Sequence, residues 1–385
     1  MMHYHLINQY LQCSIVFFLL IILFSYPSTA QVLNDSSAVI KAFENVDLTV
    51  YGRIEIGAGF DDNGDLAVSN NVPRAGFRLI KSIFDNDPDK LKIISKVEFG
   101  LDLVSRDETI TFSPDPGAQV SQVGDAVFIR MGYVGVTYKD ISIIIGKDNS
   151  LYYELGASEV DRFLAFGGTA IGVWNAGTDG GVSGTGRANQ LIKLIYSTNN
   201  LKVGAQLQAR DITDSNNKTV DTYGLGINYS IKGFAIGIGY NKVLDGVIDP
   251  QPNQANENDE AIVFASSYEF KRYEIAFSYL SFTKHEDVEV NEETIFYDGE
   301  GFEFYFKYKL TPSRKWHIAT GFNYLFPKPD QNLDDYDLKF GLVELGYNFS
   351  LGSHVFISSK FDNSKNIDGS DRLPNLYGIG IRFAF

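Results

Sequence analysis

Residues 300–310 read EGFEFYFKYKL, and this stretch decides the fold. One face carries Phe302, Phe304 and Phe306, while Glu303 and the other intervening residues fall on the opposite face. Side chains change faces at every residue in a β-strand, whereas a helix repeats every 3.6 residues. The stretch is therefore predicted to be a strand with one apolar face and one more polar face.

The same alternation recurs along most of the chain, and no long segment has helical periodicity. The strand predicted at 337–349 breaks its alternation near Gly341-Leu342, which predicts a β-bulge there. The sixteen predicted strands are 48–60, 74–84, 91–102, 126–138, 141–147, 190–197, 201–210, 221–231, 234–242, 260–270, 273–284, 299–310, 316–326, 337–349, 354–362 and 375–385.

The links between the predicted strands alternate in length. Tight links such as Lys139-Asp140, Asn199-Asn200 and Lys232-Gly233 join the strands at one end. The long links are 61–73, 103–125, 148–189, 211–220, 243–259, 285–298, 327–336 and 363–374. One plain end and one elaborated end, with strands of about ten residues, are typical of an outer-membrane β-barrel.

The N-terminus resembles an export signal. Ile15–Phe24 is an unbroken apolar run, too short to span a bilayer comfortably, and Ser28-Thr29-Ala30 supplies a small-residue cleavage site. Residues 1–12 contain no Lys or Arg, which leaves an uncleaved anchor or a misplaced start as alternatives. We predict a signal peptide at 1–30, a periplasmic lead-in at 31–47 and a barrel domain at 48–385.

Composition excludes several classes of protein. The 385 residues carry 33 Lys+Arg against 48 Asp+Glu, a net charge of −15, which argues against a nucleic-acid partner. The single cysteine, Cys13, falls in the predicted signal, so disulfides and zinc–thiolate sites are excluded. His285, His317 and His354 lie far apart in the sequence. We predict no catalytic residue, no metal ligand, no cofactor and no enzyme activity.

Alternation alone does not say which face points inward, and a soluble β-protein would bury its phenylalanines. The export signal favours a membrane barrel, as does the last strand, which alternates from Tyr377 to a terminal Phe385. Aromatic residues also mark strand ends, as in an interfacial girdle: Tyr51, Phe60, Tyr229, Tyr240, Tyr273, Trp316, Phe326 and Phe349. We therefore predict that the apolar faces meet lipid, where only a closed sheet satisfies its backbone.

Several stretches together resemble the general porins of Gram-negative bacteria. Tyr51–Gly57 (YGRIEIG) is similar to the family's opening strand, and Arg130–Lys147 (RMGYVGVTYKDISIIIGK) to the strand pair before its constriction loop. Gly146-Lys147-Asp148 departs from the family's Gly-Arg-Gln. The resemblance implies a trimeric, sixteen-stranded channel whose third long loop folds inward, and a terminal Phe385 that the barrel assembly machinery recognises.

The predicted link 148–189 is long enough to call for a function. Its apolar first half is suited to packing on the barrel wall, whereas residues 177–186 are rich in glycine. An external flap is the alternative. Acidic side chains of the loop and basic side chains of the strands would face each other across the pore. The predicted pore-lining residues are Arg53, Arg74, Arg78, Lys92, Lys96, Arg130, Glu154, Glu159 and Asp161.

The sequence therefore predicts an all-β, sixteen-stranded antiparallel transmembrane barrel with short periplasmic turns and long extracellular loops. Its predicted function is passive diffusion of small hydrophilic solutes and ions across the outer membrane, as a homotrimer surrounded by lipid. Two other functions stay open: a substrate-specific channel with a binding ladder, and a surface adhesin or receptor whose loops bind a partner.

Overall fold

The computed structural model of the chain divides into two compact units, Met1–Asp47 and Leu48–Phe385. The predicted signal peptide and residues 31–45 of the lead-in lie outside the described residues. The described residues are 46–70, 73–84, 91–101, 103–104, 127–173, 183–209, 220–244, 258–290, 293–310, 313, 315–329, 333, 335–370 and 373–385.

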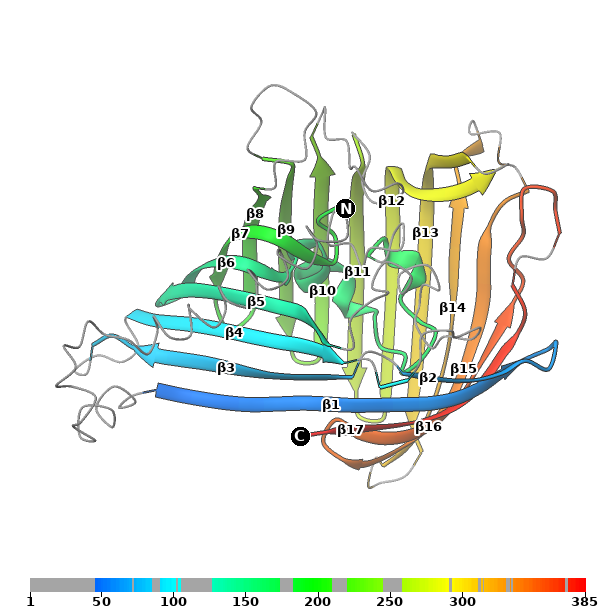
Figure 1. Cartoon of the computed structure of the whole chain (residues 1–385), viewed down its shortest axis with the longest axis horizontal. Coiled ribbons are helices and arrows are strands. Elements are labelled where there is room, and N and C mark those ends of the chain that lie inside the picture. The colour runs from blue at the N-terminus through cyan, green and yellow to red at the C-terminus, as the bar shows by residue number, and fades with distance from the viewer. Residues whose placement is uncertain are drawn as a thin grey trace, which may run out of the picture. The chain divides into compact units, whose positions relative to one another are not determined.

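The second unit is a closed antiparallel β-barrel (Figure 1). Its sheet contains seventeen strands, of which β2 is a short addition within the first long link, leaving sixteen in the wall. The strands are β1 (Val46–Asp61), β2 (Leu66–Asn70), β3 (Arg74–Ser82), β4 (Leu91–Leu101), β5 (Val127–Tyr138), β6 (Ile141–Asn149), β7 (Arg187–Ser197), β8 (Leu201–Gln208), β9 (Thr222–Ile231), β10 (Phe234–Val243), β11 (Glu260–Phe270), β12 (Tyr273–Val290), β13 (Glu293–Lys309), β14 (Trp316–Pro327), β15 (Leu338–Ser350), β16 (Ser353–Asp362) and β17 (Leu376–Ala384).

Closure joins the two ends of the sheet. β1 pairs with β3 on one side and with β17 on the other, in a register that places Arg53 opposite Ala384. The last residue completes the ladder, because the amides of Gly52 and Phe385 donate to each other's carbonyls at 3.0 Å. The sixteen-stranded antiparallel barrel predicted from the sequence is confirmed.

Two local predictions are wrong. The predicted link 285–298 is a β-hairpin, because β12 and β13 continue past the membrane-facing alternation and pair Glu286 with Tyr297 and Val288 with Ile295. The predicted bulge at 341–342 is absent: the register of β14 and β15 runs unbroken through both residues. Phe340 and Leu342 disturb the pattern because they are apolar side chains buried inside the barrel.

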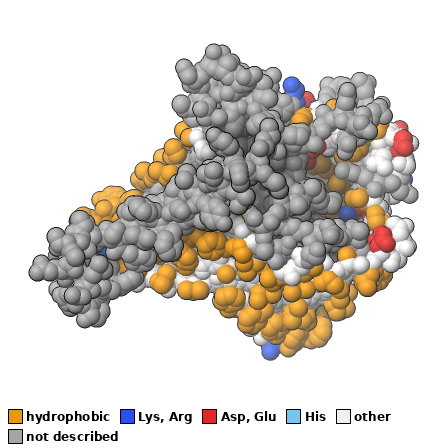
Figure 2. All heavy atoms as spheres, viewed as in Figure 1, with side chains coloured by type: hydrophobic (Ala, Val, Ile, Leu, Met, Phe, Trp, Pro, Cys, Tyr) orange, Lys and Arg blue, Asp and Glu red, His pale blue; other side chains and the backbone are white. Residues whose placement is uncertain are grey.

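The outer surface is apolar and the inner surface is polar, apart from that buried region. Ile145, Ile357 and Ile381 are each about half exposed, whereas the inward Glu303 and Lys193 are wholly buried. Figure 2 shows apolar side chains spread over the described part of the visible surface. This arrangement matches the predicted orientation, with apolar faces available to hydrocarbon.

Aromatic rings gather at both rims of the wall. At the short-turn end, Trp316 lies 4.8 Å from Tyr347, measured between ring centroids. At the loop end, Phe60 stacks 5.2 Å from Tyr377. Amphipathic rings favour the headgroup level of a bilayer, so the two rims mark the membrane interfaces.

Candidate functional site: the lumen and the inward loop

The third long link enters the barrel directly after β6. Its described parts between β6 and β7 are 150–173 and 183–186, and the first contains a π-helical turn η3 (Tyr152–Gly156) and two short 3-10 turns, η4 (Ala157–Glu159) and η5 (Thr169–Ile171). Glycines in the wall make room for η3. A Cβ added at Gly239 would lie 2.5 Å from the carbonyl oxygen of Tyr152, and one at Gly237 would lie 2.1 Å from that of Leu155. The loop backbone therefore rests directly on β10.

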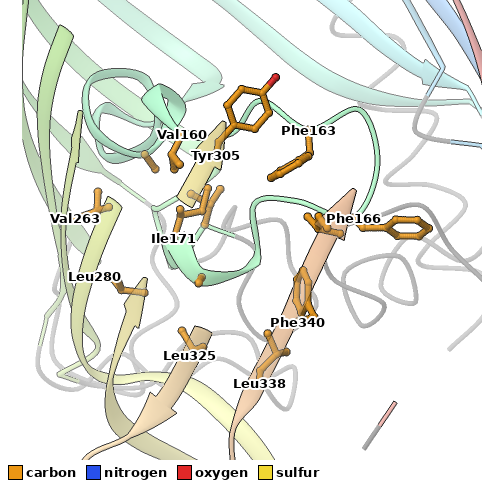
Figure 3. Packing of buried hydrophobic residues seen from close by; sticks show 14 of the residues in the cluster. Val160, Phe163, Phe166, Ile171, Val263, Leu280, Tyr305, Leu325, Leu338 and Phe340 are labelled. Carbon is orange, nitrogen blue, oxygen red and sulfur yellow. The ribbon is translucent and has the colours of Figure 1, made fainter. Parts of the chain in front are cut away.

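Apolar packing fastens the loop to one side of the lumen (Figure 3). The ring of Phe163 meets Tyr305 of β13 edge-on, with centroids 4.8 Å apart. Phe166 and Ile171 belong to the same buried cluster, whose wall residues include Val263, Leu280, Tyr305, Leu325, Phe340 and Leu342. This side of the barrel interior is a hydrophobic core rather than a water-facing surface.

Polar side chains of the same wall accept hydrogen bonds from the loop backbone. The amide of Gly168 donates to Glu303 Oε1 at 3.0 Å, and that of Leu164 donates to Glu344 Oε2 at 2.9 Å. Asn323 Oδ1 accepts from the amides of Thr169 and Ala170 at 3.1 and 3.0 Å. These bonds satisfy buried backbone donors, which are costly to leave unpaired.

Charged or ionisable side chains anchor the loop at two points. At its start, the buried Lys193 of β7 donates to Asp148 Oδ2 at 2.7 Å and to Glu154 Oε2 at 2.9 Å. Near the end of the stretch 150–173, the buried His285 ring lies 2.6 Å from Asp259 Oδ1 and 2.7 Å from the carbonyl oxygen of Gly172. The loop is thus fixed to β7 and to β12.

The opposite wall, β1 to β5 with β17, carries clustered cations. Glu98 accepts hydrogen bonds from Arg130 and, at 2.9 Å, from the Tyr51 hydroxyl. Two further cations approach the Glu98 carboxylate, Lys96 at 3.7 Å and Arg74 at 4.0 Å.

Beside this cluster, Glu55 Oε2 lies 3.7 Å from Arg53 Nε and accepts a hydrogen bond from Arg382. Glu98 and Glu55 are therefore each in contact with more than one cation of this wall.

The structure divides the predicted pore-lining residues into groups. It brings Arg53, Arg74, Lys96 and Arg130 together, and it pairs Arg78 with Lys96 across β3 and β4. Lys92 lies opposite Ser82, toward the short-turn end.

The predicted loop acids also separate. Glu154 is bonded to Lys193, and Glu159 accepts from Ser267 and Asn228 at 2.7 and 2.9 Å, so both face the wall that holds the loop.

Asp161 differs from the other two loop acids. Burial raises its pKa above the ordinary value of a carboxyl group. The Tyr153 hydroxyl donates a 2.9 Å hydrogen bond to it and opposes this rise. Charges on the cationic wall oppose it as well, from Arg53, Arg382 and Arg74. Asp161 is therefore the loop carboxyl that interacts with those arginines.

Sequence reasoning missed several charged residues of this site. Arg187 precedes the predicted strand 190–197, because β7 begins three residues earlier than its apolar alternation. Lys147 departs from the family's Gly-Arg-Gln pattern, and nothing in that departure assigns it to the pore. Lys193 and Arg382 alternate as inward residues on their strands, and that parity was the available signal.

The described residues contain no helix long and apolar enough to cross a membrane. The same residues include no group of three or more His, Cys, Asp or Glu side chains that could hold a metal ion.

Comparisons with solved structures show the fold. The chain is similar to OmpT, an outer membrane protein of Vibrio cholerae in trimer form, with 18% identity, a TM-score of 0.60, and coverage of 88% of this chain and 99% of that one. The chain is also similar to OmpF of Salmonella typhi in complex with daunomycin, with 16% identity, a TM-score of 0.68, and coverage of 89% of this chain and 98% of that one. An anion-selective porin from Comamonas acidovorans is similar as well, with 13% identity, a TM-score of 0.63, and coverage of 88% of this chain and 100% of that one.

No curated protein matches the sequence. A model of the Gram-negative porin family matches residues 19–355, which is most of the chain. That match agrees with the sixteen-stranded barrel wall, the inward loop and the clustered luminal cations described above. The chain belongs to the Gram-negative porin family.

Proposed function

We propose that this porin is a diffusion channel whose narrow section, between the inward loop and the cationic wall, favours small anions. Membership of the family makes it an outer-membrane, multi-pass β-barrel for passive diffusion of solutes. The ion preference and the pore-lining roles of Arg53, Arg74, Arg78, Lys92, Lys96, Arg130, Glu154, Glu159 and Asp161 belong to the proposal.

One observation carries the anion preference: cations outnumber carboxylates where the loop faces the wall. Five cations surround Glu55, Glu98 and Asp161 there: Arg53, Arg74, Lys96, Arg130 and Arg382. Fixed charges in a narrow, partly desolvated passage raise the local concentration of the opposite ion. The net charge of the whole chain, −15, does not decide this preference, because only the charges along the passage act strongly on the ion.

The assembly state and the absence of catalysis are also proposals. A homotrimer is supported by the trimer form of the related V. cholerae OmpT. Lipid would contact the exposed apolar band, and the barrel assembly machinery would act on the strand that ends at Phe385. We propose no enzyme activity, since the luminal carboxylates are bonded to cations or to the loop backbone.

Purified protein in planar bilayers tests the function. We expect steady conductance in KCl, and a reversal potential in a KCl gradient that shows anions crossing faster than cations. The preference should shrink as salt rises, because screening shortens the range of fixed charges. A cation-favouring reversal potential would contradict the anion preference. Negligible conductance from a folded barrel would instead favour the adhesin or receptor alternative.

A further inference from the structure

Two irregularities in the strand ladder fall at cations of the lumen. Arg130 is the extra residue of a bulge in β5, because Glu98 pairs with Met131 while Phe99 pairs with Ile129. Lys147 faces a second bulge, whose extra residue lies in β7 between Ala188 and Leu191, because β6 pairs Gly146 with Leu191 and Asp148 with Ala188. Bulges redirect side chains and recur beside functional sites, so their position at these two cations calls for an explanation.

The register places Lys147 between two arginines on the neighbouring strands. Lys147 lies opposite Gly132, two residues from Arg130, and Arg187 pairs with Asn149, two residues from Lys147. Such diagonal neighbours lie about 7–8 Å apart, within reach of long side chains. The charges interact, since both arginines act on Lys147 as like charges.

No carboxylate of the described residues forms an ion pair with Lys147. Within the described part of the chain, it has no hydrogen bond and no ion pair. The nearby carboxylate Glu98 is already engaged by Arg130, Lys96 and Arg74. Asp148, its neighbour in sequence, is bonded to Lys193. Repulsion between like charges disfavours the charged form of a lysine that lies among arginines without a carboxylate, and a bound anion would relieve that repulsion.

We infer that Lys147, with Arg130 and Arg187, forms a saturable binding site for small divalent oxyanions, the shared chemistry of phosphate, sulfate and short dicarboxylates. A divalent anion with several acceptor oxygens matches one ammonium and two planar guanidinium groups better than chloride does. The Arg130 side chain is 11% exposed and Arg187 is 7% exposed, so solute reaches the site chiefly from the side of Arg130. This inference rests on the proposed anion-conducting function.

Binding of this kind predicts saturation in a channel that otherwise conducts in proportion to concentration. With potassium phosphate as the probe, single-channel conductance should level off at a concentration where KCl conductance still rises. Phosphate added to KCl should also lower the chloride current, because an occupied site repels the next anion. Potassium succinate in place of phosphate distinguishes free inorganic anions from dicarboxylates as the tighter ligand.

Lys147→Ala should weaken phosphate saturation about tenfold, the loss expected for one charged hydrogen bond. Lys147→Arg should retain it. Lys202→Ala is the matched control, since Lys202 is an exposed residue of β8 near the short-turn end, and it should leave saturation unchanged. Conductance in KCl alone shows that each variant has folded and opens.

Linear phosphate conductance in the wild type would overturn the site, as would equal saturation in wild type and Lys147→Ala. Both results leave the anion-favouring reversal potential in KCl intact. A failure of the proposed function looks different, because the channel would then favour cations or fail to conduct in KCl.

Discussion

The two walls of the lumen differ in what covers them. On β1 to β5, Arg74 and Lys96 remain 24% and 21% exposed around the buried Glu98. On β13 to β15, Tyr305, Leu342 and their neighbours are almost wholly buried under the inward loop. The difference shows that the loop turns the β13-to-β15 side of the barrel interior into a hydrophobic core and leaves the cationic wall partly exposed.

The largest expected effect comes from opening that core. Tyr305→Ala should lower the free energy of unfolding by about 3–5 kcal/mol, the cost of deleting a buried ring. Tyr133→Ala, a partly exposed tyrosine on the cationic wall, should cost much less. Denaturant titration of both variants in lipid vesicles measures the difference, and equal losses would erase the distinction between the walls.

The residue before Tyr305 tests the outer face that both walls share. Phe304 points outward and stacks 6.0 Å from Phe322 across the strand pair. Phe304→Arg should cost about 2–4 kcal/mol, as a charge near the bilayer midplane does. Lys307→Ala, on the luminal face, should cost far less in the same titration. The reverse order would mean that the inner and outer faces are assigned the wrong way round.

The loop anchor comes next. Lys193→Met keeps the bulk of the side chain but leaves Asp148 and Glu154 without their cation, which should cost about 1–3 kcal/mol. The loop should loosen at its start, and we expect noisier single-channel current. Lys202→Met on β8 is the control, with a cost within about 0.5 kcal/mol because its side chain is exposed. Quiet current and unchanged stability in Lys193→Met would show that this anchor is dispensable.

The smallest effect concerns the loop acids and changes selectivity rather than stability. Since burial raises the pKa of Asp161, this carboxyl loses its charge at a higher pH than an ordinary aspartate does. Anion preference should therefore increase between neutral and mildly acidic pH. Reversal potentials of Asp161→Asn should lack this early increase and should favour anions already at neutral pH.

Glu159→Gln is the matched control, because that carboxylate is held by Ser267 and Asn228 on the loop-bearing wall. It should shift the reversal potential less than Asp161→Asn does. Identical pH curves for wild type and Asp161→Asn would remove Asp161 from the narrow section.

The sequence predicted the wall well because each strand carries its own two-residue period. It failed where a side chain responds to a distant part of the chain. Phe340 and Leu342 suggested a bulge because their apolar partners, including Phe163 and Phe166, lie in a loop far away in sequence.

The candidate site follows the same rule. The parity of β1, β3, β4 and β5 located Arg53, Arg74, Lys96 and Arg130. No local signal shows that Glu154 pairs with Lys193, since that contact depends on how the loop settles on the wall. The hydrogen bonds of Glu159 to Ser267 and Asn228 have no local signal either, because sequence does not show which side of a loop faces the wall.

The ion pair between Glu55 and Arg382 spans the seam of the barrel. Glu55 belongs to β1, the first strand to be synthesised, and Arg382 belongs to β17, three residues before Phe385. Before β17 pairs with β1, Glu55 has no contact with Arg382. At that stage the barrel wall is open and this cation is missing from the lumen. The pairing of β1 with β17 therefore closes the wall and completes its set of luminal charges in the same step. A barrel in which these strands have not paired would discriminate less between ions.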